Sequence, residues 1–156
     1  MTAGFTIRRA RPEDAAGVAR ELAAYLSYIG DAFEPDGLDH DIAHWQKAYD
    51  GRSGALLLVA DRAGEIVGTA AVRLLSPGVG ELKRMWLRPA CQGQGLGRRL
   101  MDACLDEARR LGCRALRLDS ESRLEAAVHL YRVYGFVDIP RYNDNRRADV
   151  WMERAL

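Results

Sequence analysis

The feature that most constrains the fold of this chain is a glycine-rich stretch between two regular segments. Gly93, Gly95 and Gly97 occupy alternate positions, after an apolar run at residues 80–87 and before an amphipathic run that begins at Leu100. Glycine lets backbone N–H groups approach a bulky group, and the N-terminus of a helix attracts anions. The pattern therefore predicts a strand, a tight loop and a helix that hold a phosphate or pyrophosphate. A glycine-rich connection without any ligand stays open as the alternative.

Two common phosphate-binding loops do not fit this stretch. The nucleotide-triphosphatase loop needs Lys followed by Ser or Thr after its last glycine, whereas Arg98 and Arg99 follow Gly97 here. The dinucleotide-binding loop, counted from Gly93, needs its third glycine at the position of Arg98. Any phosphate group held here therefore belongs to another class of ligand.

Length and composition bound the rest of the chain. The 156 residues suffice for one domain, residues 1–156, with a single core. The 23 basic and 22 acidic residues nearly cancel, so no global charge favours nucleic acid or an anionic membrane as a partner. The longest apolar run, residues 55–60, is too short to span a membrane, and residues 1–10 lack the apolar segment of a targeting signal.

The three cysteines bear on the cellular compartment. Cys91, Cys104 and Cys113 are odd in number and lack the pairing of metal ligands. Such cysteines fit a reducing compartment better than a disulfide framework. We therefore expect the protein in the cytoplasm.

The order of apolar patterns predicts an α/β protein with a mixed sheet. A helical stripe is expected to start near Pro12 and continue to Ile29, and the connection at residues 62–65 fits a hairpin. From the N-terminus the order is one strand, two helices, three strands, one helix, one strand, one helix and two strands. Strands are expected at residues 6–10, 55–61, 66–74, 80–87, 115–119, 136–139 and 149–154, and the later helices at 39–49, 100–111 and 124–134.

Residues 92–97 match the pattern Gln/Arg-x-x-Gly-x-Gly/Ala, and with this pattern the chain resembles the GCN5-related N-acetyltransferase (GNAT) family. Residues 81–89 and 127–136 are also similar to that family, in its order. The resemblance covers residues 6–153, although the helices before Gly51 match only in length and placement. It implies a single-domain, mostly antiparallel sheet flanked by helices.

The resemblance also implies the activity and the cofactor site. Members of the family bind acetyl-CoA or another acyl-CoA, so we expect an acyl-CoA-dependent N-acyltransferase with acetyl-CoA as co-substrate and no metal. The acyl group would pass to an amine by direct attack in a ternary complex. The glycine loop would take the pyrophosphate, and a strand N–H would hold the thioester oxygen. The implied cofactor-binding residues are Met85, Trp86, Leu87, Gln92, Gly93, Gln94, Gly95, Leu96, Gly97 and Arg98.

Two residues are implied as catalytic by their positions in the family pattern. Tyr131 occupies the tyrosine position, four residues before Gly135, and a phenol can give a proton to the departing thiolate. Glu81, at the start of the fourth strand, would accept the proton of the amine, with a solvated strand-end acid as the alternative. Asp119 is a weaker substitute for this base. Tyr134 is expected to be a packing residue.

One position departs from the family pattern. Relatives often carry an asparagine seven residues before the tyrosine, where it contacts the cofactor arm. This chain has Leu124 at that position. The resemblance therefore implies no asparagine contact to the cofactor at the start of this helix, and the loop and Tyr131 are unaffected.

The acceptor is expected to be a primary amine of a small molecule. Five acids in the segment that shapes the acceptor pocket in the family could favour a cationic amine, or could belong to a solvated loop. They are Asp31, Glu34, Asp36, Asp39 and Asp41. Transfer to a protein N-terminus or lysine, and a non-catalytic acyl-CoA sensor, are the alternatives. A homodimer is compatible with the family, although residues 139–156 show no interface signature.

His40 and His44 have the spacing of a two-histidine metal pair on a helix. The motif His-Glu-x-x-His is absent from the chain. A surface helix that carries two histidines is therefore the preferred interpretation, and no metal site is expected.

Overall fold

The computed structural model describes residues 4–156. Residues 1–3, the first positions of the predicted domain, lie outside the described part. Seven strands form one sheet in the order β1-β2-β3-β4-β5-β7-β6. The strands are β1 (Phe5–Arg9), β2 (Ala55–Arg62), β3 (Glu65–Ser76), β4 (Val79–Leu87), β5 (Ala115–Ser120), β6 (Val137–Asp138) and β7 (Val150–Ala155).

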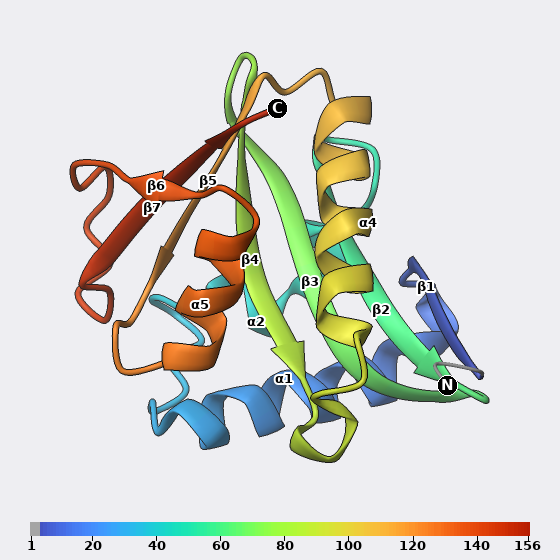
Figure 1. Cartoon of the computed structure of the whole chain (residues 1–156). Coiled ribbons are helices and arrows are strands. Elements are labelled where there is room, and N and C mark those ends of the chain that lie inside the picture. The colour runs from blue at the N-terminus through green and yellow to red at the C-terminus, as the bar shows by residue number, and fades with distance from the viewer. Residues whose placement is uncertain (1–3) are drawn as a thin grey trace.

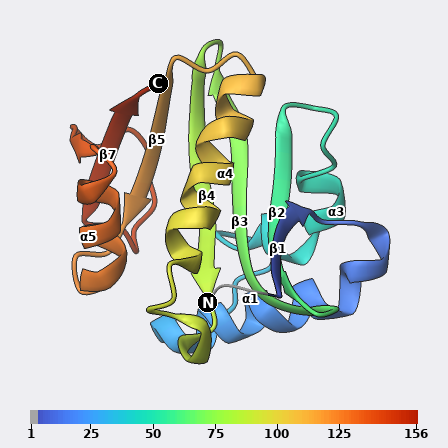
Figure 2. The same cartoon turned by 45° about the vertical axis from the view of Figure 1, so that its right-hand side comes forward.

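Helices cover both faces of this sheet (Figures 1 and 2). α4 and α5 pack on one face, where they share a core with the central strands, and α1 to α3 pack on the opposite face. The helices are α1 (Ala15–Ile29), α2 (His40–Ala43), α3 (Trp45–Ala48), α4 (Leu96–Arg110) and α5 (Glu125–Val133). Short 3₁₀ turns at Pro12–Asp14 and Pro89–Cys91 precede α1 and the glycine loop.

The sheet opens between β4 and β5, its one parallel pair in the described chain. Pairing there is confined to three residues of each strand and ends at Glu81 and Arg117. Beyond this point β5 remains paired with β7 as far as Ser120, while β4 continues beside β3 to Leu87. The two strands therefore separate (Figure 1), and the backbone of β4 after Glu81 has no strand partner on its β5 side among the described residues.

The predicted fold class is confirmed: a mixed, mostly antiparallel sheet is flanked by helices. The expected hairpin is also present, because Ala63 and Gly64 form a two-residue turn with φ values of 49° and 92°. No helix of the described residues has the length and apolarity that crossing a membrane requires.

The single helix expected at residues 39–49 is wrong, because the chain forms the two short helices α2 and α3. They are separated at His44, whose φ of −125° and ψ of 40° lie outside the helical region. The break still directs Ile42, Trp45 and Tyr49 into the core beside α1. Tertiary packing therefore prevails over the local helical pattern.

Candidate active site

The glycine loop adopts a conformation that depends on its glycines. Gly93 and Gly95 both have a φ of 77°, in the left-handed region that other residues rarely adopt. The Gln92 side-chain amide donates to the carbonyl of Leu87 at 2.9 Å. This bond ties the loop to the end of β4, so the loop and the strand edge form one surface.

The loop leads directly into the N-terminus of α4. Gly95 is the residue before the helix, and the first N–H groups, from Leu96 onward, have no acceptor within the helix. The side chain of Leu96 is fully buried in the core, so only its backbone is available to a ligand. Arg98 is exposed at the same end of α4. This end combines free donors, a positive dipole end and a cationic side chain, which suits a pyrophosphate.

A β-bulge interrupts β4 where the sheet opens. Between the pairs Ala71–Lys83 and Thr69–Trp86, β4 has two residues where β3 has one. The first of these two, Arg84, has a φ of 54°, which is uncommon for a residue with a side chain. The Thr69 hydroxyl donates to the Arg84 carbonyl at 2.9 Å and holds the bulge in place. The bulge changes the direction of the backbone N–H groups that follow it along the free edge of β4.

An apolar cavity of about 400 Å³ lies at the opening of the sheet. It is bounded by the end of β4, the glycine loop, α1 and α5. It gathers several of the residues predicted to hold the cofactor, namely Met85, Trp86, Leu87, Gln92, Gly93 and Gly97, together with Tyr131. Gln94, Gly95, Leu96 and Arg98 do not line this cavity but continue the same loop and helix. Its apolar lining and the free strand edge beside it suit an uncharged, extended chain.

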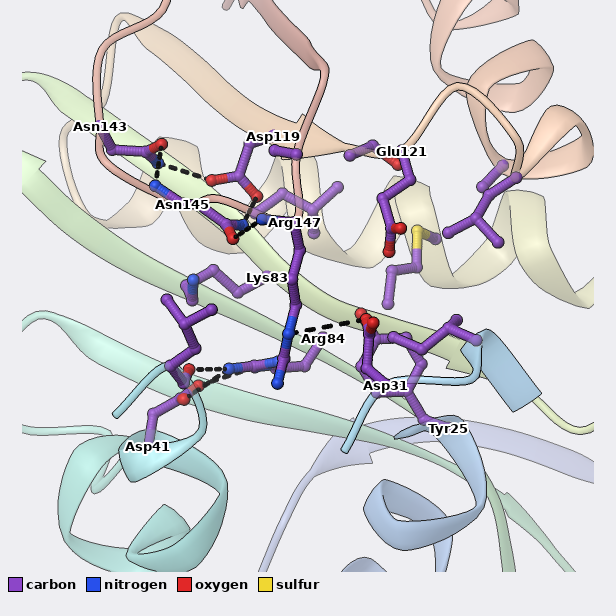
Figure 3. A pocket seen from close by; sticks show the side chains of 18 of the residues that line it. Tyr25, Asp31, Asp41, Lys83, Arg84, Asp119, Glu121, Asn143, Asn145 and Arg147 are labelled. Atoms are coloured by element: carbon purple, nitrogen blue, oxygen red, sulfur yellow. Dashed lines mark hydrogen bonds and ion pairs between the residues drawn. The ribbon is translucent and has the colours of Figure 1, made fainter. Parts of the chain in front are cut away.

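A second, polar cavity of about 660 Å³ adjoins the first (Figure 3). It lies between β4, β5, the segment 30–41 and the segment 139–149. Its polar lining includes Asp31, Asp41, Lys83, Arg84, Asp119, Glu121, Asn143, Asn145 and Arg147. The two cavities share Tyr25, Ile29, Met85, Leu124, Ala127 and Tyr131. A ligand in one cavity can therefore meet a ligand in the other at this shared wall.

Tyr131 lies at the junction of the two cavities. It projects from α5 and is 7% exposed, and its hydroxyl makes no hydrogen bond with another described residue. Burial raises the pKa of Tyr131 above its ordinary value, with smaller contributions from neighbouring acidic groups. The hydroxyl therefore keeps its proton at neutral pH and is free to donate it to a bound group.

Tyr134, by contrast, is held by α4. Its hydroxyl donates to Asp102 at 2.8 Å and lies 3.0 Å from the carbonyl oxygen of Arg98. Burial raises the pKa of Tyr134 to about 12, assisted by the bond to Asp102. Neither cavity is lined by this residue. Its position agrees with the structural role expected from the sequence.

Glu81 is separated from the two cavities, although it lies on β4. It is 1% exposed and lines neither of them. One carboxylate oxygen is 2.8 Å from the Arg73 guanidinium, and the other accepts a hydrogen bond from the Tyr142 hydroxyl at 2.7 Å. With both oxygens engaged, direct contact with an acceptor amine would require a rearrangement. The role of Glu81 as base stays a prediction.

Asp119 is the carboxylate that borders the polar cavity from β5. Its two oxygens accept hydrogen bonds from the side-chain amides of Asn143 and Asn145. These amides stabilise the carboxylate without neutralising its charge. The sequence pattern around residues 143–145 gave no indication of this role, because the contact requires the segment to fold back on β5.

The segment 139–149 borders the polar cavity and binds the segment 30–41. The Arg147 guanidinium is 2.9 Å from Asp39 and 3.0 Å from Glu34, and it donates to the carbonyl of Ala32 at 2.8 Å. Arg146 pairs with Glu34 as well. Four of the five acids singled out in the sequence, all except Asp36, thus have arginine partners. They are largely structural rather than free to select a cationic acceptor.

His40 lines the polar cavity, whereas His44 and the three cysteines line neither cavity. The rings of His40 and His44 are 4.5 Å apart, and in the described part of the chain no group of three His, Cys, Asp or Glu side chains could hold a metal ion. Cys91, Cys104 and Cys113 are buried as free thiols.

Comparisons with known proteins agree with this geometry. The profile described as the acetyltransferase (GNAT) family matches residues 17–136. The chain is 42% identical over 82 residues to the IAA acetyltransferase of Azospirillum brasilense, which covers 52% of this chain and 54% of that relative. The match thus spans about half the length of that protein.

Two further similarities extend over most of the chain. It is 34% identical over 145 residues to the aminoglycoside N(6')-acetyltransferase type 1 of Stenotrophomonas maltophilia, covering 87% of this chain and 88% of that relative. It also resembles the structure of yncA from Salmonella typhimurium with its cofactor acetyl-CoA, with a TM-score of 0.74 and 25% identity over 97% of this chain and 94% of that one.

Proposed function

The chain belongs to the acetyltransferase (GNAT) family of acetyl-CoA-dependent N-acyltransferases, and on this premise we propose that it transfers an acetyl group to the primary amine of a small molecule. The observation that carries the proposal is the meeting of two cavities at Tyr131 and Met85. One cavity follows the free edge of β4 and the other is polar. This arrangement suits direct transfer between two ligands bound at the same time.

The cofactor is proposed to bind along the glycine loop and β4. When bound, acetyl-CoA supplies an acyl group activated as a thioester. The N–H groups of residues 93–98 hold the pyrophosphate, and the Arg98 guanidinium adds a positive charge. The free edge of β4 from Met85 to Leu87 would pair with the pantetheine arm, and one N–H there would stabilise the negative charge that develops on the thioester oxygen.

Tyr131 is proposed as the general acid. Its buried, protonated hydroxyl borders both cavities and would donate its proton to the departing thiolate sulfur. For the amine proton two carboxylates are proposed. Asp119 borders the polar cavity directly. Glu81 does not line the cavity, but it forms ion pairs with Arg73 and Lys83, which both line it. Comparing Glu81→Gln with Asp119→Asn distinguishes them, because the variant that lacks the base should lose kcat strongly while its Kd for CoA is unchanged.

The contacts of Arg147 at the polar cavity support a small acceptor. A protein substrate needs room for the chain on each side of the acetylated residue, and the contacts of Arg147 with Ala32 and Asp39 join two of the segments that border this cavity. The similarity to an aminoglycoside acetyltransferase is in keeping with an amine acceptor. Transfer to proteins and a sensor without turnover remain the alternatives to be tested.

A binding titration and a turnover assay test this proposal together. We expect calorimetry to detect binding of CoA, and CoA release from acetyl-CoA to rise with at least one small amine. The panel contains an aminoglycoside, a polyamine, free amino acids and peptides with a free N-terminus or lysine. Turnover of peptides alone would indicate a protein acetyltransferase. Binding of CoA without turnover of any amine would indicate a sensor, and no binding of CoA would contradict both.

A further inference from the structure

Lys83 and Asp119 face each other across the opening of the sheet. The last parallel pair joins Glu81 of β4 to Arg117 of β5, and each of the two residues lies two positions further along its strand. Side chains two residues apart point to the same face of a strand. Lys83 and Asp119 therefore occupy equivalent positions on the same face, just where the strands separate, and both line the polar cavity (Figure 3).

The Lys83 ammonium is a cation without a dedicated partner. Its side chain is only 19% exposed, and buried lysines are normally paired with an anion. Its nearest carboxylate among the described residues is Glu81, at 3.8 Å. That carboxylate is already engaged by Arg73 at 2.8 Å and by the Tyr142 hydroxyl at 2.7 Å. Two cations thus share one anion, which leaves a net positive charge at this wall.

Asp119 is an anion that is bound only by neutral groups among the described residues. It accepts hydrogen bonds from two neutral amides, those of Asn143 and Asn145, and no basic side chain of the described residues lies within ion-pair distance of it. The wall formed by β5 therefore carries a negative charge. The side chains of Lys83 and Asp119 do not pair with each other, because the strands diverge between them.

The other basic residues of the cavity are already satisfied. The Arg84 guanidinium binds Asp41 through two hydrogen bonds and also lies 3.3 Å from Asp39. Arg147 binds Asp39 and Glu34. The cation available to a ligand is therefore Lys83, supported by its neighbour Arg73.

We propose that the acceptor is a zwitterion of the amino-acid class, with its carboxylate on Lys83 and its amine on Asp119. This inference rests on the proposed function and names the class of its acceptor. Such a molecule carries one charge of each sign, as the two walls of the opening do. A polyamine, in contrast, would place a cation beside Lys83. Asp119 and Tyr131 both line the polar cavity, so an amine held by Asp119 would share this cavity with the Tyr131 hydroxyl.

Matched acceptors and matched lysine variants test the proposal. The acceptors are L-amino acids with neutral side chains, their carboxamides and the corresponding decarboxylated amines. In the natural chain we expect kcat/KM for the best amino acid to exceed that for its amide by roughly tenfold to a hundredfold, the range of a charged hydrogen bond. The variant Lys83→Gln should reduce this ratio to about one while the affinity for CoA is unchanged.

The chain supplies its own control. Lys47, on α3, is the other lysine of the sequence, is exposed and lines neither cavity. Lys47→Gln should therefore leave unchanged the ratio of kcat/KM for the amino acid to kcat/KM for its amide. Asp119→Asn should weaken the use of amino acid and amide alike, since it removes the partner of the amine that both share.

The outcomes separate this inference from the proposed function. An amide or decarboxylated amine used as well as the amino acid, or a ratio unchanged in Lys83→Gln, would overturn the inference while leaving the transferase intact. If no amine is turned over, the proposed function fails, and calorimetry with the CoA-saturated protein then decides the inference. Tighter binding of amino acids than of amides, lost in Lys83→Gln, supports it, and equal or absent binding contradicts it.

Discussion

The Arg84 guanidinium on β4 and the Asp41 carboxylate on α2 are joined by two hydrogen bonds, of 2.7 and 3.0 Å. This pair connects the bulged strand of the opening to the short helices that border the polar cavity. Burial alone would raise the pKa of Asp41, but the bonds and charge of Arg84 outweigh burial and lower the pKa to about 2. The Tyr49 hydroxyl also binds Asp41.

Asp41→Asn should therefore destabilise the fold in a pH-dependent way. A carboxyl whose pKa is lower in the folded chain stabilises it above the unfolded pKa of about 3.8, and this stabilisation is lost as the pH falls through about 2. We expect the free energy of unfolding at pH 7 to fall by about 2 kcal/mol. In urea titrations the difference in the free energy of unfolding between this variant and the natural chain should become smaller below pH 4. Asp36→Asn, at an exposed position, is the control, and an equal loss at every pH would contradict the assignment.

Gly95→Ala should weaken CoA binding more than it weakens the fold. Gly95 precedes α4 with a φ of 77°, and a residue with a Cβ resists this conformation at a cost of about 1 kcal/mol. Relief of that strain would turn the first N–H groups of the helix away from the pyrophosphate. Calorimetry should show at least a tenfold rise in the Kd of CoA, an order-of-magnitude expectation for charge-assisted bonds.

Gly64→Ala provides the comparison for this prediction. Gly64 also has a positive φ, 92°, and a Cβ there would meet no neighbour within 4 Å, as at Gly95. Its hairpin between β2 and β3 does not belong to either cavity. The two variants should lose similar stability, and an equal loss of CoA affinity in Gly64→Ala would show that the loop has no specific role.

The parts that sequence predicts well are those set by local patterns. The glycine loop, the strand before it and the amphipathic α4 follow from residue type and periodicity over some thirty consecutive residues. The hairpin at Ala63 and Gly64 follows for the same reason. Tyr131 was found by its position in a family pattern, and the structure gives that position a physical setting at the junction of the two cavities.

The remaining features depend on contacts between distant segments. The bulge residue Arg84 is bound by Asp41, 43 positions earlier, and Arg147 binds Asp39 across 108 positions. Neither partner can be read from the local sequence around the other. The same limit explains why the local pattern at residues 39–49 predicts one helix, and why the local sequence does not predict the partners of Glu81.

Arg147→Ala should open the polar cavity. Asp39 is fully buried and Arg147 is 2.9 Å from it, so the substitution removes one of the two arginines that compensate this carboxylate. We expect the KM for the acceptor to rise about tenfold or more, as for loss of a charged contact, while the Kd of CoA stays unchanged. Limited proteolysis should cleave segment 139–149 faster than in the natural chain.

Arg146→Ala tests whether this effect is specific. Arg146 is 62% exposed and pairs only with Glu34 among the described residues, and exposed ion pairs contribute little to stability. Its substitution should leave the acceptor KM and the proteolysis rate nearly unchanged. A tenfold rise of KM in Arg146→Ala would mean that total charge, rather than closure by Arg147, controls the acceptor.

Tyr131→Phe should lower kcat with little change in binding. The substitution removes one hydroxyl that has no hydrogen-bond partner among the described residues, so the fold and the Kd of CoA should be preserved. Loss of a general acid costs about a hundredfold or more in rate. Because burial raises the pKa of Tyr131, ionisation of this residue should not limit kcat up to about pH 10.

Tyr134→Phe separates the chemical role of Tyr131 from the general effects of losing a nearby phenol hydroxyl. Its hydroxyl binds Asp102 of α4, so its loss should reduce stability by about 1 kcal/mol and leave kcat within a factor of a few. A variant Tyr131→Phe with nearly full kcat would assign the proton to another group, and Tyr25 borders both cavities. A large loss of kcat in Tyr134→Phe would instead assign the acid to Tyr134, which lies three positions after Tyr131 and directly follows α5.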